Sequence, residues 1–230
     1  MFVLTPEEIT AILLSLKVAA VAMAASLPFG IAVAWLLARR DFPGKALVDA
    51  LVHMPLILPP VVTGYALLLL FGRRGLLGGW LGDQLGIVLA FRWTGAALAC
   101  AVMGFPLLVR AIRLSIEAID PRLEAAAGTL GAAPAFVFLT VTLPLMLPGI
   151  LAGMVLSFAR AFGEFGATIT FVSNIPGETQ TLPTAIYVFT QVPGGDAQAL
   201  RLTLVAVAIA AAALIGSEIL ARRVGRQVRG

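Results

Sequence analysis

Two oppositely charged side chains lie inside a long apolar stretch of this 230-residue chain. Arg160 and Glu164 are four positions apart, so on a helix they share a face and can form an ion pair. Counted from a helix start near Pro148, both fall toward mid-membrane, where an isolated charge costs about 3 kcal/mol or more. Two interpretations follow: the pair fixes the register of a helix, or Arg160 borders the path of an anionic substrate.

No set of residues in the sequence is arranged for catalysis. A Gly-x-x-x-x-Gly-Lys-Ser/Thr motif is absent, so the chain cannot hydrolyse ATP by the P-loop route. The sequence also lacks a Cys/His/carboxylate cluster for a metal and a nucleophile beside a base. We expect His53 to be a hydrogen-bonded residue between helices and Cys100 to be a small packing residue. The chain is therefore expected to be no enzyme, with no catalytic residue, no metal site and no cofactor of its own.

The composition is that of an integral membrane protein. Hydrophobic residues make up 60% of the chain and charged residues 12%, and the mean hydropathy is +1.01. Soluble domains average about a quarter charged residues. These values predict an all-α membrane protein with one domain over residues 1–230. No basic stripe with interleaved aromatic residues indicates nucleic-acid binding, so we assign the high pI to topology and contact with the lipid bilayer.

Five apolar stretches approach the roughly 20 residues that a helix needs to cross the hydrocarbon core. They cover residues 9–38, 47–71, 93–109, 147–172 and 200–220. A sixth stretch, Thr181 to Val192, is apolar but short, and Pro183 suits the first turn of a helix. We expect it to form a short helix between the others on the outer side, which leaves five spans, or six if it also crosses.

The basic residues indicate an orientation. With the N-terminus outside, the inner segments carry Arg39, Arg40, Lys45, Arg110, Arg113, Arg122, Arg222, Arg223, Arg226 and Arg229. The outer segments then carry only Arg73, Arg74, Arg92 and Arg201. Because cytoplasmic loops are enriched in Lys and Arg, the N-terminus is predicted outside and the C-terminus in the cytoplasm. The loop between the third and fourth spans, about residues 115–144, then also lies in the cytoplasm.

The second apolar stretch cannot remain one straight helix. Pro59 and Pro60 are adjacent and Gly64 follows them. Proline frees a backbone carbonyl, which inside a bilayer must be satisfied by neighbouring groups or by water in a cavity. We interpret this segment as a bend beside a central pathway.

The loop over residues 115–144, called the two-helix loop below, is apolar for a segment in water. Asp120 is a plausible N-cap and Pro121 suits the first position of a helix. Gly131 can supply the left-handed stop of this helix. Pro134 then suits the start of a second helix, which we expect Pro144 to end. The sequence thus predicts a compact pair of short helices with an apolar tip, suited to insertion into another protein.

The spacing within this loop resembles the EAA loop of ABC importer permeases, which docks into a groove on the ATPase subunit. The matching positions are Ala126, Ala127, Gly131, Val141, Leu143 and Pro144. The acidic residue that opens the motif would fall at Ala125, and Glu124 lies one position earlier. The resemblance implies the type I ABC importer permease fold with a cytoplasmic two-helix coupling loop.

Other segments resemble the permeases of molybdate importers. These are residues 27–30, 42–47, 58–65, 105–107, 109–113, 163–168 and 173–179. The Gly-Glu-Phe-Gly-Ala segment at 163–167 also resembles sulfate and thiosulfate permeases, whereas the run at 173–179 favours molybdate. The resemblance implies molybdate transport across the cytoplasmic membrane, with tungstate as a second substrate and sulfate or thiosulfate as the alternative.

The same resemblance implies partners. They are a second copy of this chain, two copies of an ABC ATPase that bind ATP and Mg²⁺, and a periplasmic or extracellular protein that delivers the anion. A secondary anion transporter that works without ATP is a more distant alternative. Such transporters are built from internal repeats or carry ionisable residues along several spans, and here we find only Arg160, Glu164 and His53. A membrane enzyme or assembly factor is another alternative, but no reactive set of residues supports it.

Overall fold

The computed structural model describes residues 4–229, with side chains over residues 4–216, and its regular structure there is helical. The helices are α1 (Pro6–Arg39), α2 (Lys45–Ile57), α3 (Pro60–Phe71), α4 (Leu76–Leu85), α5 (Trp93–Glu117), α6 (Pro121–Thr129), α7 (Pro134–Val137), the π-helical turn η1 (Phe138–Thr142), α8 (Leu143–Phe162), α9 (Gly166–Val172), α10 (Leu182–Gln191) and α11 (Asp196–Arg229).

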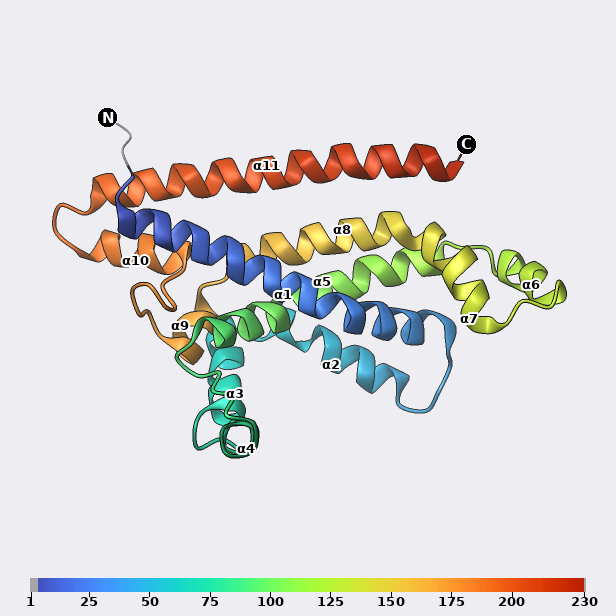
Figure 1. Ribbon diagram of the computed structural model, residues 1–230, viewed down its shortest axis with the longest axis horizontal. Coiled ribbons are helices and arrows are strands. Elements are labelled where there is room, and N and C mark those ends of the chain that lie inside the picture. Colours follow the sequence, from blue (N-terminus) through green and yellow to red (C-terminus); the bar gives the residue numbers. More distant parts are fainter. Residues whose placement is uncertain (1–3, 230) are drawn as a thin grey trace.

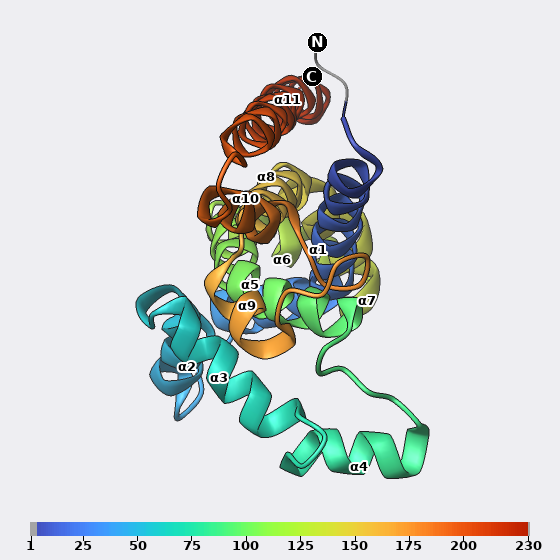
Figure 2. The same cartoon turned by 90° about the vertical axis from the view of Figure 1, so that its left-hand side faces the viewer.

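The long helices run side by side along the longest axis of the molecule (Figure 1). The chain begins at the end where α9 and α10 lie, and α11 carries it back toward the end where α6 and α7 lie. Described residues near the two termini therefore lie at opposite ends of the bundle. In the end-on view, α11 stands apart from the central helices, and α3 and α4 extend to the other side (Figure 2).

The lengths of the helices fit five membrane crossings. In the part of the chain that the structure describes, four continuous helical stretches are long and apolar enough to span a bilayer: Pro6–Arg39, Trp93–Glu117, Pro134–Phe162 and Asp196–Gly216. The pair α2 and α3, which bend by 115° at the break between them, is together long and apolar enough to be a fifth, broken crossing. The stretch 181–192 forms α10, a ten-residue helix with Pro183 in its first turn, so the expectation of a short helix is confirmed. Helix α4 was not expected from the sequence.

The fourth expected crossing differs from the prediction. Residues 147–172 were expected to form one helix, but α8 ends at Phe162 and the separate helix α9 begins at Gly166. Gly163 and Gly166 flank the break, and Phe165 has a non-helical backbone there. Apolarity over 26 residues gave no sign of this break, because hydropathy does not distinguish one buried helix from two.

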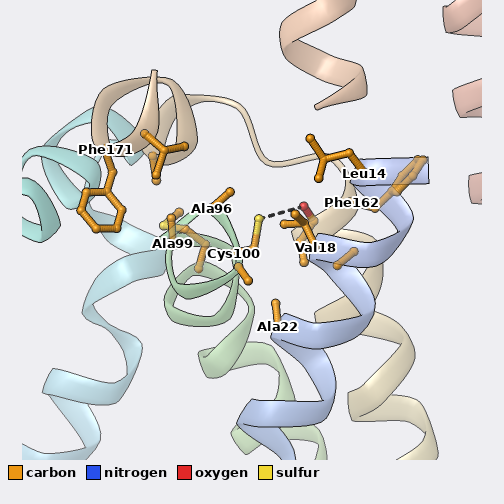
Figure 3. Close-up of a cluster of buried hydrophobic side chains, with 14 of the residues drawn as sticks. Leu14, Val18, Ala22, Ala96, Ala99, Cys100, Phe162 and Phe171 are labelled. Carbon is orange, nitrogen blue, oxygen red and sulfur yellow. Dashed lines mark hydrogen bonds between the residues drawn. The ribbon is translucent and has the colours of Figure 1, made fainter. Parts of the chain in front are cut away.

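The core at the N-terminal end is built from small residues, which allow α1, α5 and α8 to approach closely. Figure 3 shows Cys100 of α5 directed toward Val18 and Ala22 of α1, while Ala99 lies on the side of α5 nearer Phe171. Cys100 is 1% exposed, and its thiol donates to the carbonyl oxygen of Ala161 at 3.4 Å. This agrees with its expected role as a packing residue.

Helices α5 and α8 meet where glycine on one helix faces serine on the other. A Cβ added to Gly104 of α5 would lie 2.6 Å from Oγ and 3.0 Å from the carbonyl oxygen of Ser157 in α8. Gly149 of α8 faces Ser115 of α5 in the same way. The two helices can therefore keep this separation only with glycine at these positions.

A buried ion pair joins the first and last long helices. Glu8 forms a capping box with Thr5 at the start of α1, with its carboxylate accepting from the Thr5 N–H at 2.7 Å. The other carboxylate oxygen of Glu8 accepts from Arg201 of α11 at 2.8 Å, and the Glu8 side chain is fully buried. Nearby, the backbone N–H of Leu182 donates to Ser15 Oγ at 2.6 Å, which attaches α10 to α1.

We predict that Gly104→Val lowers the melting temperature of the purified protein in detergent by several degrees. The added side chain must push α5 and α8 apart, and overpacking of this kind costs about 1–3 kcal/mol. The matched control is Gly82→Val in α4, where a Cβ meets nothing within 4 Å. Equal melting temperatures for the two variants would contradict the close approach of α5 and α8.

Candidate functional site

The first half of the two-helix loop follows the local signals in its sequence. The side chain of Asp120 accepts from the N–H of Arg122 at 2.9 Å, and Pro121 is the first residue of α6. Gly131 has φ +84°, a left-handed conformation that favours glycine, so the expected stop is confirmed. The cap and the stop of α6 are therefore both set by residues of the loop itself.

The second half differs from the prediction at Pro144. Pro134 lies in the first turn of α7, as expected. Pro144 does not end this helix, because the chain continues through η1 into α8, with Pro144 in the first turn of α8. In a regular α-helix, the ring of Pro144 would clash with the backbone carbonyl of the residue four positions earlier. That residue lies in the π-helical turn η1, which is wider than an α-helical turn. The loop is thus continuous with the fourth crossing.

The tip of the two-helix loop is apolar and uncovered by the described part of the chain. Leu130 is 88% exposed, and Phe136 and Leu139 are also exposed. Between α6 and α7 lies a hollow of about 590 Å³, lined by Ala127, Leu130, Gly131, Ala132, Ala133, Phe136 and Thr140. An exposed apolar surface around a hollow is typical of a site that binds another protein.

The residues of the EAA-like motif occupy two different environments. Ala125 and Ala126 are exposed on α6, while Ala127 and Gly131 line the hollow. Val141 and Leu143 are half-buried, and Leu143 packs against the core at this end of the bundle. The first part of the motif therefore forms the tip, and the second part attaches the loop to the bundle.

Glu124 turns inward, away from the tip. Its Oε1 lies 3.3 Å from Nη2 of Arg39, at the end of α1, and accepts from Thr142 Oγ1 at 2.7 Å. The same Nη2 of Arg39 donates to the carbonyl oxygen of Ile119 at 3.4 Å. Sequence reasoning missed Arg39 and Thr142, because nothing local relates positions so far apart in the chain.

Arg160 and Glu164 form the expected ion pair, but not as neighbours on one helix. Arg160 lies in the last turn of α8, and Glu164 follows the end of that helix. The second carboxylate oxygen of Glu164 accepts from the N–H of Ala167 at 2.8 Å, which caps the start of α9. The Glu164 side chain is 1% exposed and that of Arg160 is 27% exposed. The pair therefore joins α8 to α9 across the break between them.

The other predicted bend lies against this break. Pro59 precedes α3 and Pro60 is its first residue. A Cβ added to Gly64 of α3 would lie 2.5 Å from the carbonyl oxygen of Ala167 in α9, and one added to Gly166 would lie 2.7 Å from Pro60. Figure 2 shows α3 and α9 side by side. The structure thus brings the two sets of candidate pathway residues into one region.

His53 lies in a charged cluster at the other end of the bundle. Its Nδ1 is 2.9 Å from the backbone carbonyl of Asp49. The carboxylate of Asp49 pairs with Arg113 of α5 at 2.9 Å, and Arg113 also pairs with Glu117. Among the side chains of residues 4–216, no three His, Cys, Asp or Glu come together as a group that could hold a metal ion.

The chain is similar to a known protein family and to individual transport permeases. The family described as "Binding-protein-dependent transport system inner membrane component" matches residues 26–229. The molybdenum transport system permease protein ModB of Escherichia coli K12 is 60% identical over 220 residues, covering 96% of both chains. The sulfate transport system permease protein CysT of the same organism is 37% identical, covering 98% of this chain and 80% of CysT.

Solved structures share the fold. A bacterial ABC transporter that imports the acidic polysaccharide alginate matches with a TM-score of 0.72 and 17% identity, covering 96% of this chain and 80% of that chain. The architecture is therefore that of an ABC importer permease, as the two-helix loop led us to expect.

We predict that Arg160→Met destabilises the protein more than the double variant Arg160→Met/Glu164→Gln. The single variant leaves a buried carboxylate without its cation, which costs about 3–5 kcal/mol. In the double variant, the glutamine oxygen can still accept from the N–H of Ala167. Thermal unfolding in detergent measures the difference. Equal stability of the two variants would mean that the Glu164 carboxylate does not depend on Arg160.

Proposed function

This chain belongs to the family of binding-protein-dependent transport system inner membrane components, and we propose that it is the permease subunit of an ATP-driven molybdate importer, with tungstate as a second substrate. The observation that carries this proposal is the 60% identity to a molybdenum permease over 96% of both chains. The sulfate permease is more distant at 37% identity, which disfavours the sulfate or thiosulfate alternative.

The two-helix loop is the proposed contact with the ATPase. Its exposed Leu130 and Phe136, around the hollow that contains Gly131, provide an apolar surface for a complementary groove. Burial of such side chains in a groove removes apolar surface from water, which favours association. Glu124 is directed inward, so in this proposal it holds the loop in place and does not form part of the docking surface.

ATP and Mg²⁺ would be bound by two copies of the ATPase, because this chain has no P-loop motif. We further propose that two copies of this chain form the membrane unit and that a soluble molybdate-binding protein delivers the anion. A bacterial alginate ABC transporter of the same fold forms a crystal complex with a periplasmic protein that holds an alginate pentasaccharide, which supports delivery by a soluble binding protein.

The shape of the loop supports a mechanical form of coupling. Within the two-helix loop, residues 118–120 connect α5 to α6, and η1 connects α7 to α8. A movement of the loop imposed by the ATPase would therefore pass along both helices without an intervening flexible linker. At the far end of α8, it reaches the region where α9 packs against α3. We propose that this region borders the path of the anion and that Arg160, the partly exposed member of its ion pair, faces that path.

The protein is a multi-pass component of the inner membrane. We propose that its N-terminus faces outward and that its C-terminus and two-helix loop face the cytoplasm. The distribution of Arg and Lys between the loops supports this orientation.

The proposed function predicts ATP-dependent molybdate uptake. Vesicles would contain this chain with the ATPase and the binding protein that co-purify with it, and uptake of labelled molybdate would be measured with and without internal ATP. We expect uptake only with ATP, inhibited by tungstate and not by an equal concentration of sulfate. Leu130→Asp should abolish association with the ATPase, because a carboxylate in an apolar groove loses its hydration.

The matched control for this variant is Leu76→Asp, at the start of α4, where the leucine is 81% exposed and an acidic residue suits the first helical turn. It should bind the ATPase normally. Uptake that does not require ATP would overturn the proposal, and preferential inhibition by sulfate would favour the sulfate alternative.

The proposed orientation predicts a pattern of cysteine labelling. A membrane-impermeant maleimide should not reach a Thr129→Cys variant in intact spheroplasts but should label it in inverted vesicles. Asp83→Cys in α4, on the opposite side of the predicted topology, should give the reverse result. The native Cys100 is buried and should contribute little background. Labelling of residue 129 from outside would place the loop in the wrong compartment.

A further inference from the structure

The structure links the two-helix loop to the end of α1 through charged and polar atoms. Glu124 Oε1 accepts from Thr142 at 2.7 Å and lies 3.3 Å from Arg39 Nη2, which also donates to Ile119. The guanidinium of Arg39 and the carboxylate of Glu124 therefore lie where four elements meet: the ends of α1 and α5, helix α6 and the turn η1.

Apolar packing between α1 and the loop is incomplete. An open apolar groove of about 740 Å³ lies between them, lined by Pro28, Ile31, Ala32, Trp35, Leu36, Pro134, Ala135, Phe138 and Leu139. The rings of Trp35 and Phe138 meet edge to face, with centroids 6.5 Å apart. Helix α6 itself has no buried residue. The polar link therefore attaches to α1 a helix that makes no buried apolar contact of its own.

The link is sequestered from solvent. The side chains of Arg39 and Glu124 are 16% and 23% exposed, and Thr142 is 2% exposed. At this degree of burial the attraction between the charges is screened less than at an open surface, and removal of one partner leaves the other poorly solvated. Nε of Arg39 is buried and makes no hydrogen bond within the described residues. If the loop shifts, Nε of Arg39 is thus available to donate a hydrogen bond to the Glu124 carboxylate.

We propose that Arg39 and Glu124 are positioning residues that make α1 move together with the two-helix loop. This inference rests on the proposed coupling function and extends it to a third helix. Direct chain connections carry loop movement into α5 and α8, whereas α1 has no such connection. The ion pair joins the loop itself to the end of α1, in addition to the packing of Ala34 and Leu37 against α5 and α8, and without it the loop would move relative to that end of α1.

The test measures molybdate uptake and ATP hydrolysis in the same vesicles, with the complete complex. Arg39→Gln or Glu124→Gln should lower the number of anions transported per ATP hydrolysed severalfold, because α1 then no longer moves with the loop. The amount of bound ATPase should be unchanged. The charge exchange Arg39→Glu/Glu124→Arg should restore much of the ratio. A merely structural role would reduce the yield of complex and both activities together, leaving the ratio as it was.

The matched control is Arg40→Gln, which removes the same charge from the adjacent residue. Arg40 is exposed, and its guanidinium lies over the ring of Trp35 at 5.5 Å from the ring centroid. Its substitution should leave the transport ratio unchanged. Unchanged ratios in both single variants, or loss of ATPase binding in Glu124→Gln, would overturn the inference.

A second measurement keeps the inference testable if the single variants fail to fold. In the otherwise unaltered complex, the distance between spin labels at positions 41 and 129 should be the same with and without trapped nucleotide, because α1 and the loop move together. A separation that changes between the two states would overturn the proposal. Absence of ATP-driven uptake by the unaltered complex would instead count against the proposed function itself.

Discussion

Inside a bilayer, every backbone N–H and C=O needs a partner, and two broken crossings in this chain make that requirement acute. The break before α3 and the break before α9 lie against each other, where glycine allows the backbones to touch at Gly64 and Ala167. Glu164 satisfies the N–H of Ala167, and Arg160 neutralises Glu164. The irregular backbone is thereby placed inside protein, which is where a pathway for a polar solute can be lined without exposing carbonyls to lipid.

The two ends of the molecule are then joined by close helix packing. Helices α5 and α8 approach through glycine and serine along much of their length, so a displacement at one end is transmitted with little loss. At the loop end, charged side chains tie α1, α2 and α6 to this pair through Arg39, Asp49 and Arg113. An exposed apolar tip on a rigidly held loop is well suited to receive force from another protein.

Local signals in the sequence predicted local structure well. Asp120, Gly131 and Pro134 act through neighbouring backbone atoms, so their types and spacing were sufficient to place both ends of α6 and the start of α7. Pro144 and Glu164 were assigned to the wrong helical context, because a π-helical turn and a break between two apolar helices change no hydropathy pattern. The contact of Arg39 with Glu124 depends on how distant segments pack, which no spacing in the sequence records.

The ion pair between Glu8 and Arg201 has a consequence for biosynthesis. Its members are 193 positions apart, in the first and last crossings. A nascent chain inserted from its N-terminus carries Glu8 without this arginine until α11 has been synthesised. A prematurely terminated chain never acquires it, and the site in which Glu8 is fully buried cannot close around a paired charge. Closure of the helix bundle around the Glu8 carboxylate therefore requires the arginine that α11 brings to it.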